Sequence, residues 1–294
     1  MPLPRILLAI LAMAIIGSNA TFSKIGLSEF PPILFSFFRF AFTLPLAFFI
    51  PRPRIPLKLL MSIALSLGIL HITLVNIGLH LGAQASTSSF IIQSGSLFAI
   101  FFGYLILNAK PSHYDLLGIT VGAFGLIIIF SGKNLSGNLT SLCFCLISAI
   151  MWGLGYTLVK KANSKALPIT IWMSLLISPI LALTSFLFEG SELIFRSLSE
   201  ATFIGWTSAF YSSWASMLVA GGILMHLMQT ETIAKAAPFN MLIPVFGTLT
   251  SIIWLDDHLS SSILIGGAWI LLGLSISQFG SPIVALLRNK PKVL

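Results

Sequence analysis

Ten apolar stretches follow one another along almost the whole chain, and each is long enough to cross a bilayer as a helix. A helix needs roughly 20 apolar residues to span the ~30 Å hydrocarbon core. Only 8% of the residues are charged, against roughly 25% in a soluble domain. The short alternating segments of a membrane β-barrel are missing. The sequence therefore predicts an all-α integral membrane protein with ten transmembrane helices, at about 3–23, 33–50, 59–80, 85–107, 114–131, 139–159, 169–188, 203–227, 233–255 and 262–280.

The ten stretches form two sets of five with matching residues at matching places. Early in each set the offset is 136 residues, and Gly17, Thr21 and Lys24 recur as Gly153, Thr157 and Lys160. Later the offset is 148, and Asn108, Gly118 and Gly125 recur as Asp256, Gly266 and Gly273. Because five is odd, the second set enters the membrane from the opposite side, which is typical of inverted-repeat transporters. We therefore expect one five-helix repeat over 1–135 and a second, with a basic C-terminal tail, over 136–294.

The net charge of +8 is distributed according to membrane side. If both termini lie on one side, that side holds twelve of the sixteen cations: Arg5, Arg52, Arg54, Lys58, Lys110, Lys160, Lys161, Lys165, Lys235, Arg288, Lys290 and Lys292. An excess of lysine and arginine marks cytoplasmic loops. We therefore expect both termini in the cytoplasm and no nucleic-acid partner. The first stretch also fits a secretory signal, but its place in the repeat favours a membrane span.

Several segments resemble a known family. These are GSNATFSKIGL in the first span, Arg39-Phe40 in the second, GITVGAFG in the fifth, MWGLGYTLVKK in the sixth and APFNMLIPVFGTLTSIIWLDDHL in the ninth. Together they resemble the EamA-type members of the drug/metabolite transporter superfamily over nearly the whole chain. Within that family the chain is most similar to bacterial inner-membrane exporters of O-acetylserine and cysteine, through PRPRIPLKLL, Gln93, Thr230-Glu231-Thr232 and Ala237-Pro238. It departs from the family at Asn108-Ala109-Lys110 and Asp256-Asp257-His258, where Gly-Glu or Asp-Glu is frequent.

Polar side chains inside spans indicate where a substrate binds, because such groups are costly in lipid unless they face protein or a water-filled cavity. In the fourth span Ser86, Ser89, Gln93 and Ser96 share one helix face. In the third span, Asn76 offers hydrogen bonds, and His71 could also carry a proton in coupled transport. Bonds to neighbouring helices remain the alternative for all of these residues.

Further candidates are spread over both halves. Asn19 and Tyr156 occupy nearly equivalent places in the two repeats, where a midplane site would form. Trp152 and Trp214 could supply aromatic walls. Asn240 lies between Pro238 and Pro244, which disrupt the local backbone ladder. We expect the substrate site to draw on the full set of Asn19, His71, Asn76, Ser89, Gln93, Trp152, Tyr156, Trp214 and Asn240.

Arg39 is the single cation that lies fully inside a predicted span, since Arg5 and Lys235 stand at the ends of theirs. It could bind an anionic group of the substrate, pair with an acid during gating, or extend to the interface. Glu231 is the best acidic partner, although it lies near Lys235 at a cytoplasmic connection. We assign Arg39 a gating or charge role.

Three functions remain open on sequence grounds. The first is a secondary transporter that exports small polar metabolites across the bacterial cytoplasmic membrane, with proton coupling as one option. The chain has no Walker phosphate loop and no zinc or redox spacing, so we expect no cofactor, no metal and no enzymatic activity. The alternatives are a carrier of other metabolites or drugs, a membrane-embedded transferase, and a passive channel or structural helical subunit. The expected partners are a small-molecule substrate and the lipid bilayer, with the chain as a monomer or homodimer.

Overall fold

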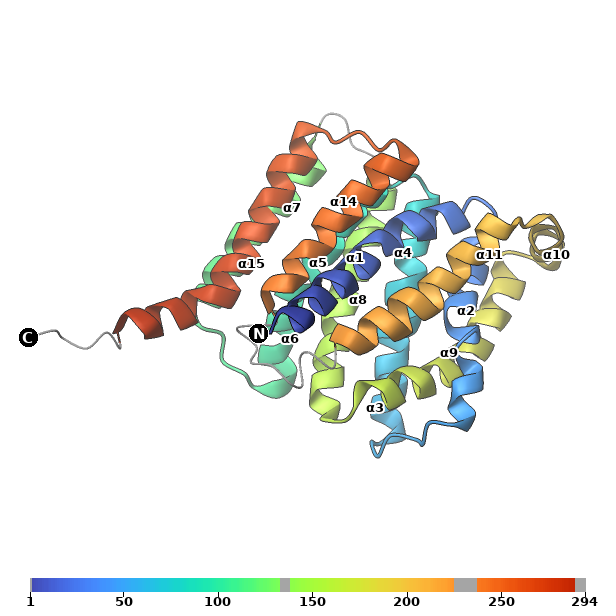
Figure 1. Ribbon diagram of the computed structural model, residues 1–294, viewed down its shortest axis with the longest axis horizontal. Helices are drawn as coiled ribbons and strands as arrows, with labels where there is room; N and C mark the ends of the chain where they lie inside the picture. The colour runs from blue at the N-terminus through green and yellow to red at the C-terminus, as the bar shows by residue number, and fades with distance from the viewer. Residues whose placement is uncertain (1, 133–137, 225–236, 289–294) are drawn as a thin grey trace, which may run out of the picture.

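The computed structural model describes residues 2–132, 138–224 and 237–288, all of whose regular elements are helical (Figure 1). The first half contains α1 (Leu3–Gly26), α2 (Pro32–Ala41), η1 (Leu44–Phe48), α3 (Leu57–Ile63), η2 (Ala64–Leu70), α4 (His71–His80), α5 (Ala85–Gln93), α6 (Gly95–Leu107) and α7 (His113–Ser131). The second contains α8 (Leu139–Ala162), α9 (Ala166–Phe188), α10 (Ser191–Glu200), α11 (Phe203–Phe210), η3 (Tyr211–Ala220), η4 (Ala237–Met241), α14 (Leu242–Leu255) and α15 (Ser261–Arg288). The all-helical prediction is confirmed for these residues.

The observed helices do not correspond one to one with the ten expected spans. Within the described residues, seven helices are long and apolar enough to cross a membrane, and two shorter apolar helices cover Pro32–Phe48 and Phe239–Leu255. The helix that begins at Phe203 continues to residue 224, the last residue of this described range. The second expected span is divided because Pro45 has no N–H to continue a helix that ends at Ala41. Ten uninterrupted transmembrane helices are therefore not confirmed.

The third span of each repeat contains a wide π-helical segment. η2 and η3 stand at corresponding places, because residues 64–70 plus the offset of 148 give 212–218, inside Tyr211–Ala220. π-helical turns lack the regular α-helical spacing and are frequent at functional sites. The fourth span also deviates from the expected 85–107, since α5 and α6 are separated at Ser94.

Equivalent glycines of the two repeats make equivalent contacts. A Cβ on Gly17 would collide with the α14 backbone at Ile243 and Gly247, and one on Gly153 would collide with the α6 backbone at Gly95 and Ala99. The offset of 148 converts 95 and 99 into 243 and 247. The first helix of each half therefore packs on the fourth span of the other half, and Figure 1 shows α1 beside α14.

The last helices of the two halves cross in the same reciprocal way. Gly118 of α7 faces the carbonyl of Gly273 in α15, and Gly125 faces that of Gly266. Small residues at such crossings let helix backbones approach closely in lipid. α7 and α15 accordingly lie side by side (Figure 1). Their outward faces carry exposed apolar side chains such as Phe124 and Leu272, which suit contact with lipid.

Carboxylates close one end of the bundle, here called the distal end, where α1 ends and α15 begins. Glu189 accepts hydrogen bonds from the N–H groups of Ile33 (2.6 Å) and Leu34 (2.9 Å) in the first turn of α2. Glu29 accepts from Thr202 N (2.6 Å) and Oγ1 (2.7 Å) just before α11. Such acids satisfy N–H groups that lack helical partners.

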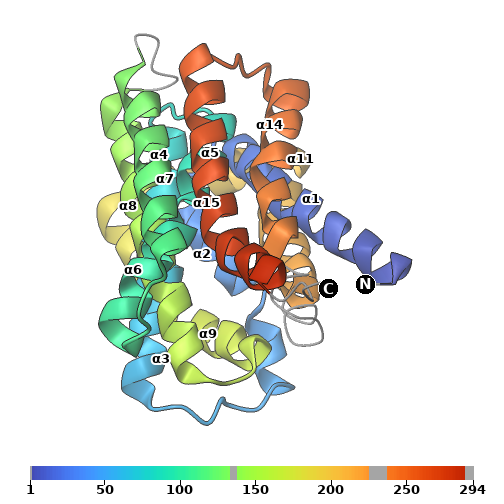
Figure 2. The ribbon, with the colours of Figure 1, turned by 90° about the vertical axis from the view of Figure 1, so that its left-hand side faces the viewer.

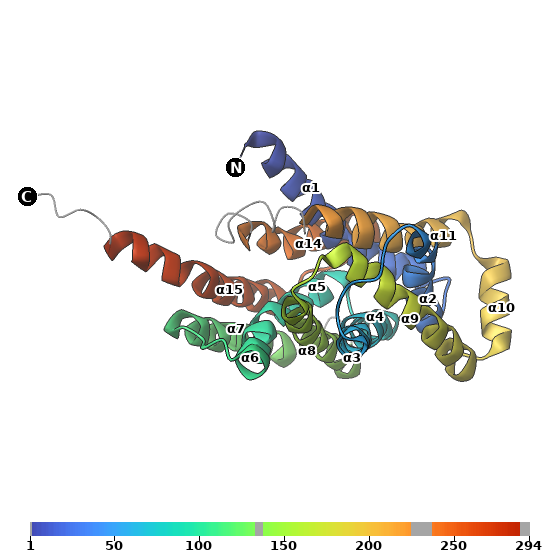
Figure 3. The same cartoon turned by 90° about the horizontal axis from the view of Figure 1, so that it is seen from below.

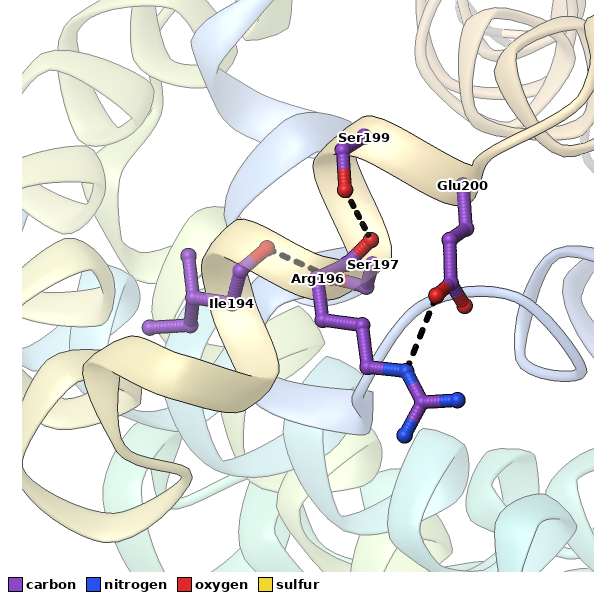
Figure 4. Close-up of polar contacts among 5 residues, drawn as sticks. All are labelled: Ile194, Arg196, Ser197, Ser199 and Glu200. Carbon is purple, nitrogen blue, oxygen red and sulfur yellow. Dashed lines mark hydrogen bonds and ion pairs between the residues drawn. The ribbon is translucent and has the colours of Figure 1, made fainter.

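The amphipathic helix α10 extends the distal end. It stands at the edge of the molecule in Figure 3, away from the C-terminus. An exposed ion pair joins Arg196 Nε to Glu200 Oε1 (3.0 Å) on this helix (Figure 4). The connections before α3 and between α8 and α9 lie at the opposite end, at the bottom of Figure 2.

Candidate functional site

The guanidinium of Arg39 joins three helices from both halves of the chain. Its Nη1 donates to Asn19 Oδ1 of α1 (3.2 Å) and to Ser212 Oγ of η3 (2.6 Å). The three residues lie seven, seven and nine positions from the distal ends of α1, α2 and α11. At 1.5 Å per residue, they are about 10 to 14 Å inside the bundle. We call Asn19, Arg39 and Ser212 the Arg39 cluster.

The wide η3 segment supplies a second contact beside the Arg39 cluster. The Tyr211 hydroxyl lies 2.6 Å from Ser18 Oγ and donates to the carbonyl of Ile15 (3.3 Å). Its ring stacks on Phe22 with centroids 4.0 Å apart. The next serine, Ser213, has a buried Oγ without a partner among the described residues. Tyr211, Ser212 and Ser18 were missed from the sequence, although Ser18 adjoins Asn19 and the Tyr-Ser-Ser-Trp run is unusually polar for a span.

His71 and Asn76 lie between helices and are hydrogen-bonded there. His71 Nδ1 lies 2.8 Å from Ser148 Oγ and 3.1 Å from the Ser148 carbonyl, while Ser148 Oγ donates back to the His71 carbonyl (2.9 Å). Asn76 Nδ2 donates to Ser36 Oγ (2.9 Å). These bonds join α4 to α8 and to α2, which corresponds to the interhelical alternative noted for both residues.

The break in the fourth span brings two predicted residues together. Gln93, the last residue of α5, donates from Nε2 to the Asn240 carbonyl of η4 (3.2 Å). The Asn240 Oδ1 is buried and has no partner among the described residues. Ser89 instead donates to the Ala85 carbonyl in its own helix (2.8 Å) and lies against Gly247.

The predicted aromatic residues form two separate stacks. Trp152 and Tyr156 stack on α8 with centroids 5.4 Å apart. Trp214 stacks on Phe210 at 5.7 Å, and its Nε1 donates to the Phe42 carbonyl (3.1 Å). The direct contacts of the nine predicted residues therefore fall into several local groups, with Asn19 alone bonded to Arg39.

The two aspartates of the Asp256-Asp257-His258 segment have structural roles. Asp256 has the left-handed φ of 52°, matching the 53° of its repeat equivalent Asn108, and both end a helix. Asp257 Oδ2 accepts from Ser86 N (3.3 Å) and Oγ (3.2 Å) at the start of α5. Among the described residues no three His, Cys, Asp or Glu side chains are grouped as a metal site. Glu231, the acid proposed to pair with Arg39, lies outside the described residues.

Two cavities lie near the distal end. One of about 440 Å³ is lined by Glu29, His80, Glu189 and apolar neighbours. The other, of about 420 Å³, is lined by Thr207 and the rings of Phe42, Phe203, Trp206 and Phe210. None of the residues predicted for the substrate site lines either one.

Comparison with known proteins reveals relatives along nearly the whole chain. A "Probable amino-acid metabolite efflux pump" of Escherichia coli (strain K12) is 26% identical over 283 residues, which cover 93% of this chain and 94% of the relative. An "Uncharacterized inner membrane transporter YedA" of the same strain is 26% identical over 91% of this chain and 87% of its own. An "Uncharacterized transporter YoaV" of Bacillus subtilis (strain 168) is 23% identical over 94% and 97%.

The fold and the repeat also have counterparts. A solved crystal structure with 13% sequence identity superimposes with a TM-score of 0.62 and covers 98% of this chain and 99% of that one. The EamA-like transporter family matches twice, over residues 3–131 and 139–278. The protein is thus a membrane transporter that belongs to the EamA-like transporter family.

Proposed function

We propose that this protein is a secondary transporter that exports small polar metabolites across the bacterial cytoplasmic membrane by alternating access. The proposed substrates are amino acids and their derivatives, of the O-acetylserine and cysteine kind. The relatives named amino-acid metabolite efflux pumps, aligned over 93% of the chain, support this class. They are 26% identical, so the individual substrate needs its own test.

The Arg39 cluster is the observation that carries the proposal. A charged side chain about 10 to 14 Å inside an apolar bundle is expensive and typically functional in a membrane protein. Its partners Asn19 and Ser212 come from opposite halves of the chain. A ligand at this point contacts both halves, as alternating access about a central site requires.

The reciprocal glycine contacts support a rocking motion of two similar halves. The first helix of each half packs on the other half, so a relative rotation of the halves opens one end of the bundle while it closes the opposite end. At the distal end, the contacts of Glu29, Glu189 and Asp257 must loosen for release on that side. In this proposal the path is lined by Gln93 and Asn240 foremost, and by Ser89, Trp152, Tyr156 and Trp214, while His71 and Asn76 hold helices together.

Reconstitution in proteoliposomes tests the function. We expect saturable, stereoselective uptake of one or more members of an amino-acid panel, measured with and without an imposed pH gradient. A rise in flux with the gradient indicates proton coupling. Unsaturable flux, or none for any member, contradicts a carrier. Unchanged flux after separate substitution of Asn19, Gln93 and Tyr156 contradicts the assigned site.

A further inference from the structure

We infer that Arg39 binds a carboxylate, so that the transported metabolites carry a free carboxylate group. This inference rests on the proposed transport function and specifies the chemistry of its site. It depends on three features of the Arg39 cluster: an edge of the guanidinium and a positive charge that both lack partners among the described residues, and the asymmetry of the repeats.

One edge of the guanidinium is left without partners. Both hydrogen bonds that Arg39 makes within the described part of the chain leave from Nη1, which donates to Asn19 and Ser212. Nε is fully buried and has no hydrogen-bond partner in the described part of the chain. Nη2 donates no hydrogen bond to the described residues either. The Nε and Nη2 edge presents two parallel N–H donors, the geometry that binds a carboxylate bidentately.

The positive charge lacks a protein partner among the described residues. Of the eight acidic residues, seven are described, and none of the seven bonds to Arg39. Extension of the side chain to the interface is opposed by the bonds to Asn19 and Ser212, which hold Nη1 inside the bundle. A buried charge without a counter-charge is strongly unfavourable. A substrate carboxylate offsets this penalty while it is bound.

The Arg39 cluster has no counterpart at the repeat-related positions. The offset of 136 converts Arg39 into Leu175 and Asn19 into Gly155, and the offset of 148 relates Ser212 to Ala64. The repeat-related place, at Leu175, Gly155 and Ala64, therefore has none of the three polar groups. One carboxylate therefore binds per chain.

Ligand analogues test the inference without altering the protein. The probes are L-cysteine, its methyl ester, which lacks the carboxylate, and N-acetyl-L-cysteine, which keeps it. Binding to the purified full-length chain is measured by thermal shift, and competition by counterflow of labelled L-cysteine in proteoliposomes. We expect L-cysteine and N-acetyl-L-cysteine to bind and compete, and the ester to do so at least tenfold more weakly. Equal potency of the ester overturns the inference.

Variants then connect the carboxylate to Arg39. We expect Arg39→Gln to reduce L-cysteine affinity at least tenfold and to remove the preference over the ester, with Arg39→Lys in between because it keeps the charge but not the paired donors. Arg52→Gln, at an exposed cation on the connection before α3, is the matched control and should leave both values unchanged. If Arg39→Gln does not fold, Asn19→Ala and Ser212→Ala report the loss of guanidinium positioning through the same preference.

An ion pair with Glu231 is the rival explanation. Full recovery of L-cysteine affinity in the Arg39→Gln, Glu231→Gln double variant would show that Arg39 serves an acid of the protein, and would overturn the inference. Saturable amino-acid flux that is equal for acid and ester also overturns the inference but leaves transport intact. Carboxylate-dependent binding without flux overturns transport and keeps the binding site.

Discussion

Polar residues inside the bundle fall into two physical types. His71 and Asn76 use short bonds to Ser148 and Ser36 and thereby hold helices together. Arg39 has more donors than its two partners can use. Because lipid offers no hydrogen bonds, the first type is satisfied by protein groups alone, whereas Arg39 Nε has no partner among the described residues.

Ser148→Ala should lower the stability of the protein while leaving its substrate preference unchanged. The variant removes two short contacts to His71, and interhelical hydrogen bonds in membranes contribute roughly 0.5 to 1.7 kcal/mol each. Unfolding by detergent titration measures the change in the free energy of unfolding. Counterflow competition measures the substrate preference.

Thr120→Ala is the matched control for this measurement. Its hydroxyl is exposed and donates only to the Leu116 carbonyl of its own helix (3.0 Å), so little change is expected. A changed pH dependence of flux in Ser148→Ala would instead place His71 on a proton path, the other role open to this histidine.

The sequence could single out site residues only where the residue type is itself unusual in a membrane span. Arg39 and Asn19 stood out because charge and amide groups are rare in a span, and the structure brings them together. Ser212 and Tyr211 were not singled out, because serine and tyrosine are common in membrane helices. Their significance depends on which helix faces α1 and α2, and that is a tertiary property.

At the scale of the helix, close backbone approach determines the pairing of α7 and α15. Gly118 and Gly125 face the carbonyls of Gly273 and Gly266, so no Cβ fits at either crossing. The same constraint holds at Gly17 and Gly153. At each of these recurring glycines the helices therefore approach too closely for a side chain.

Gly125→Ala should destabilise the fold by roughly 1 to 3 kcal/mol, because the added methyl collides with the Gly266 backbone and forces the helices apart. Thermal unfolding in detergent measures the effect. Gly103→Ala is the matched control, since a Cβ there meets no atom within 4 Å and alanine favours the helix by up to about 1 kcal/mol. Equal effects of both variants would show that the crossing is not close-packed.

Helix breaks were only partly predictable. Pro45 explains the end of the second span, since proline interrupts the ladder of hydrogen bonds. Nothing in the composition of residues 64–70 or 211–220 distinguishes π-helix from α-helix. Both segments pack against other helices, η2 against α8 and α9 and η3 against α1, and these contacts cannot be read from the local sequence.

At the scale of the molecule, the proposed orientation can be tested by labelling. In a variant without Cys143 and Cys145, we expect a membrane-impermeant maleimide to label Glu192→Cys in intact cells and Lys165→Cys only after permeabilisation. Both positions are exposed, and they lie in connections at opposite ends of the bundle. The physical basis is the excess of cations on the side of Lys165. The reverse labelling pattern would place the termini outside.

Alternating access predicts that a covalent link between the halves stops transport. Thr21 Oγ1 of α1 and Thr250 Oγ1 of α14 lie 3.0 Å apart. In the same cysteine-free background, oxidation of the Thr21→Cys, Thr250→Cys pair should abolish flux, and a reductant should restore it. Thr21→Cys alone should be unaffected by the oxidant. Full flux through the cross-linked protein would contradict relative motion at this contact.

The sequence by itself determined the membrane class, the repeat and the family resemblance, because apolar length, glycine spacing and charge bias are written along the chain. Only the tertiary structure decided which polar residues meet. Arg39, Asn19 and Ser212 are brought together by helices from both halves, whereas His71 and Asn76 are used in packing. The reason is physical: in lipid a helix satisfies its own backbone, so sequence specifies each helix locally, while side-chain partners follow from how the helices pack.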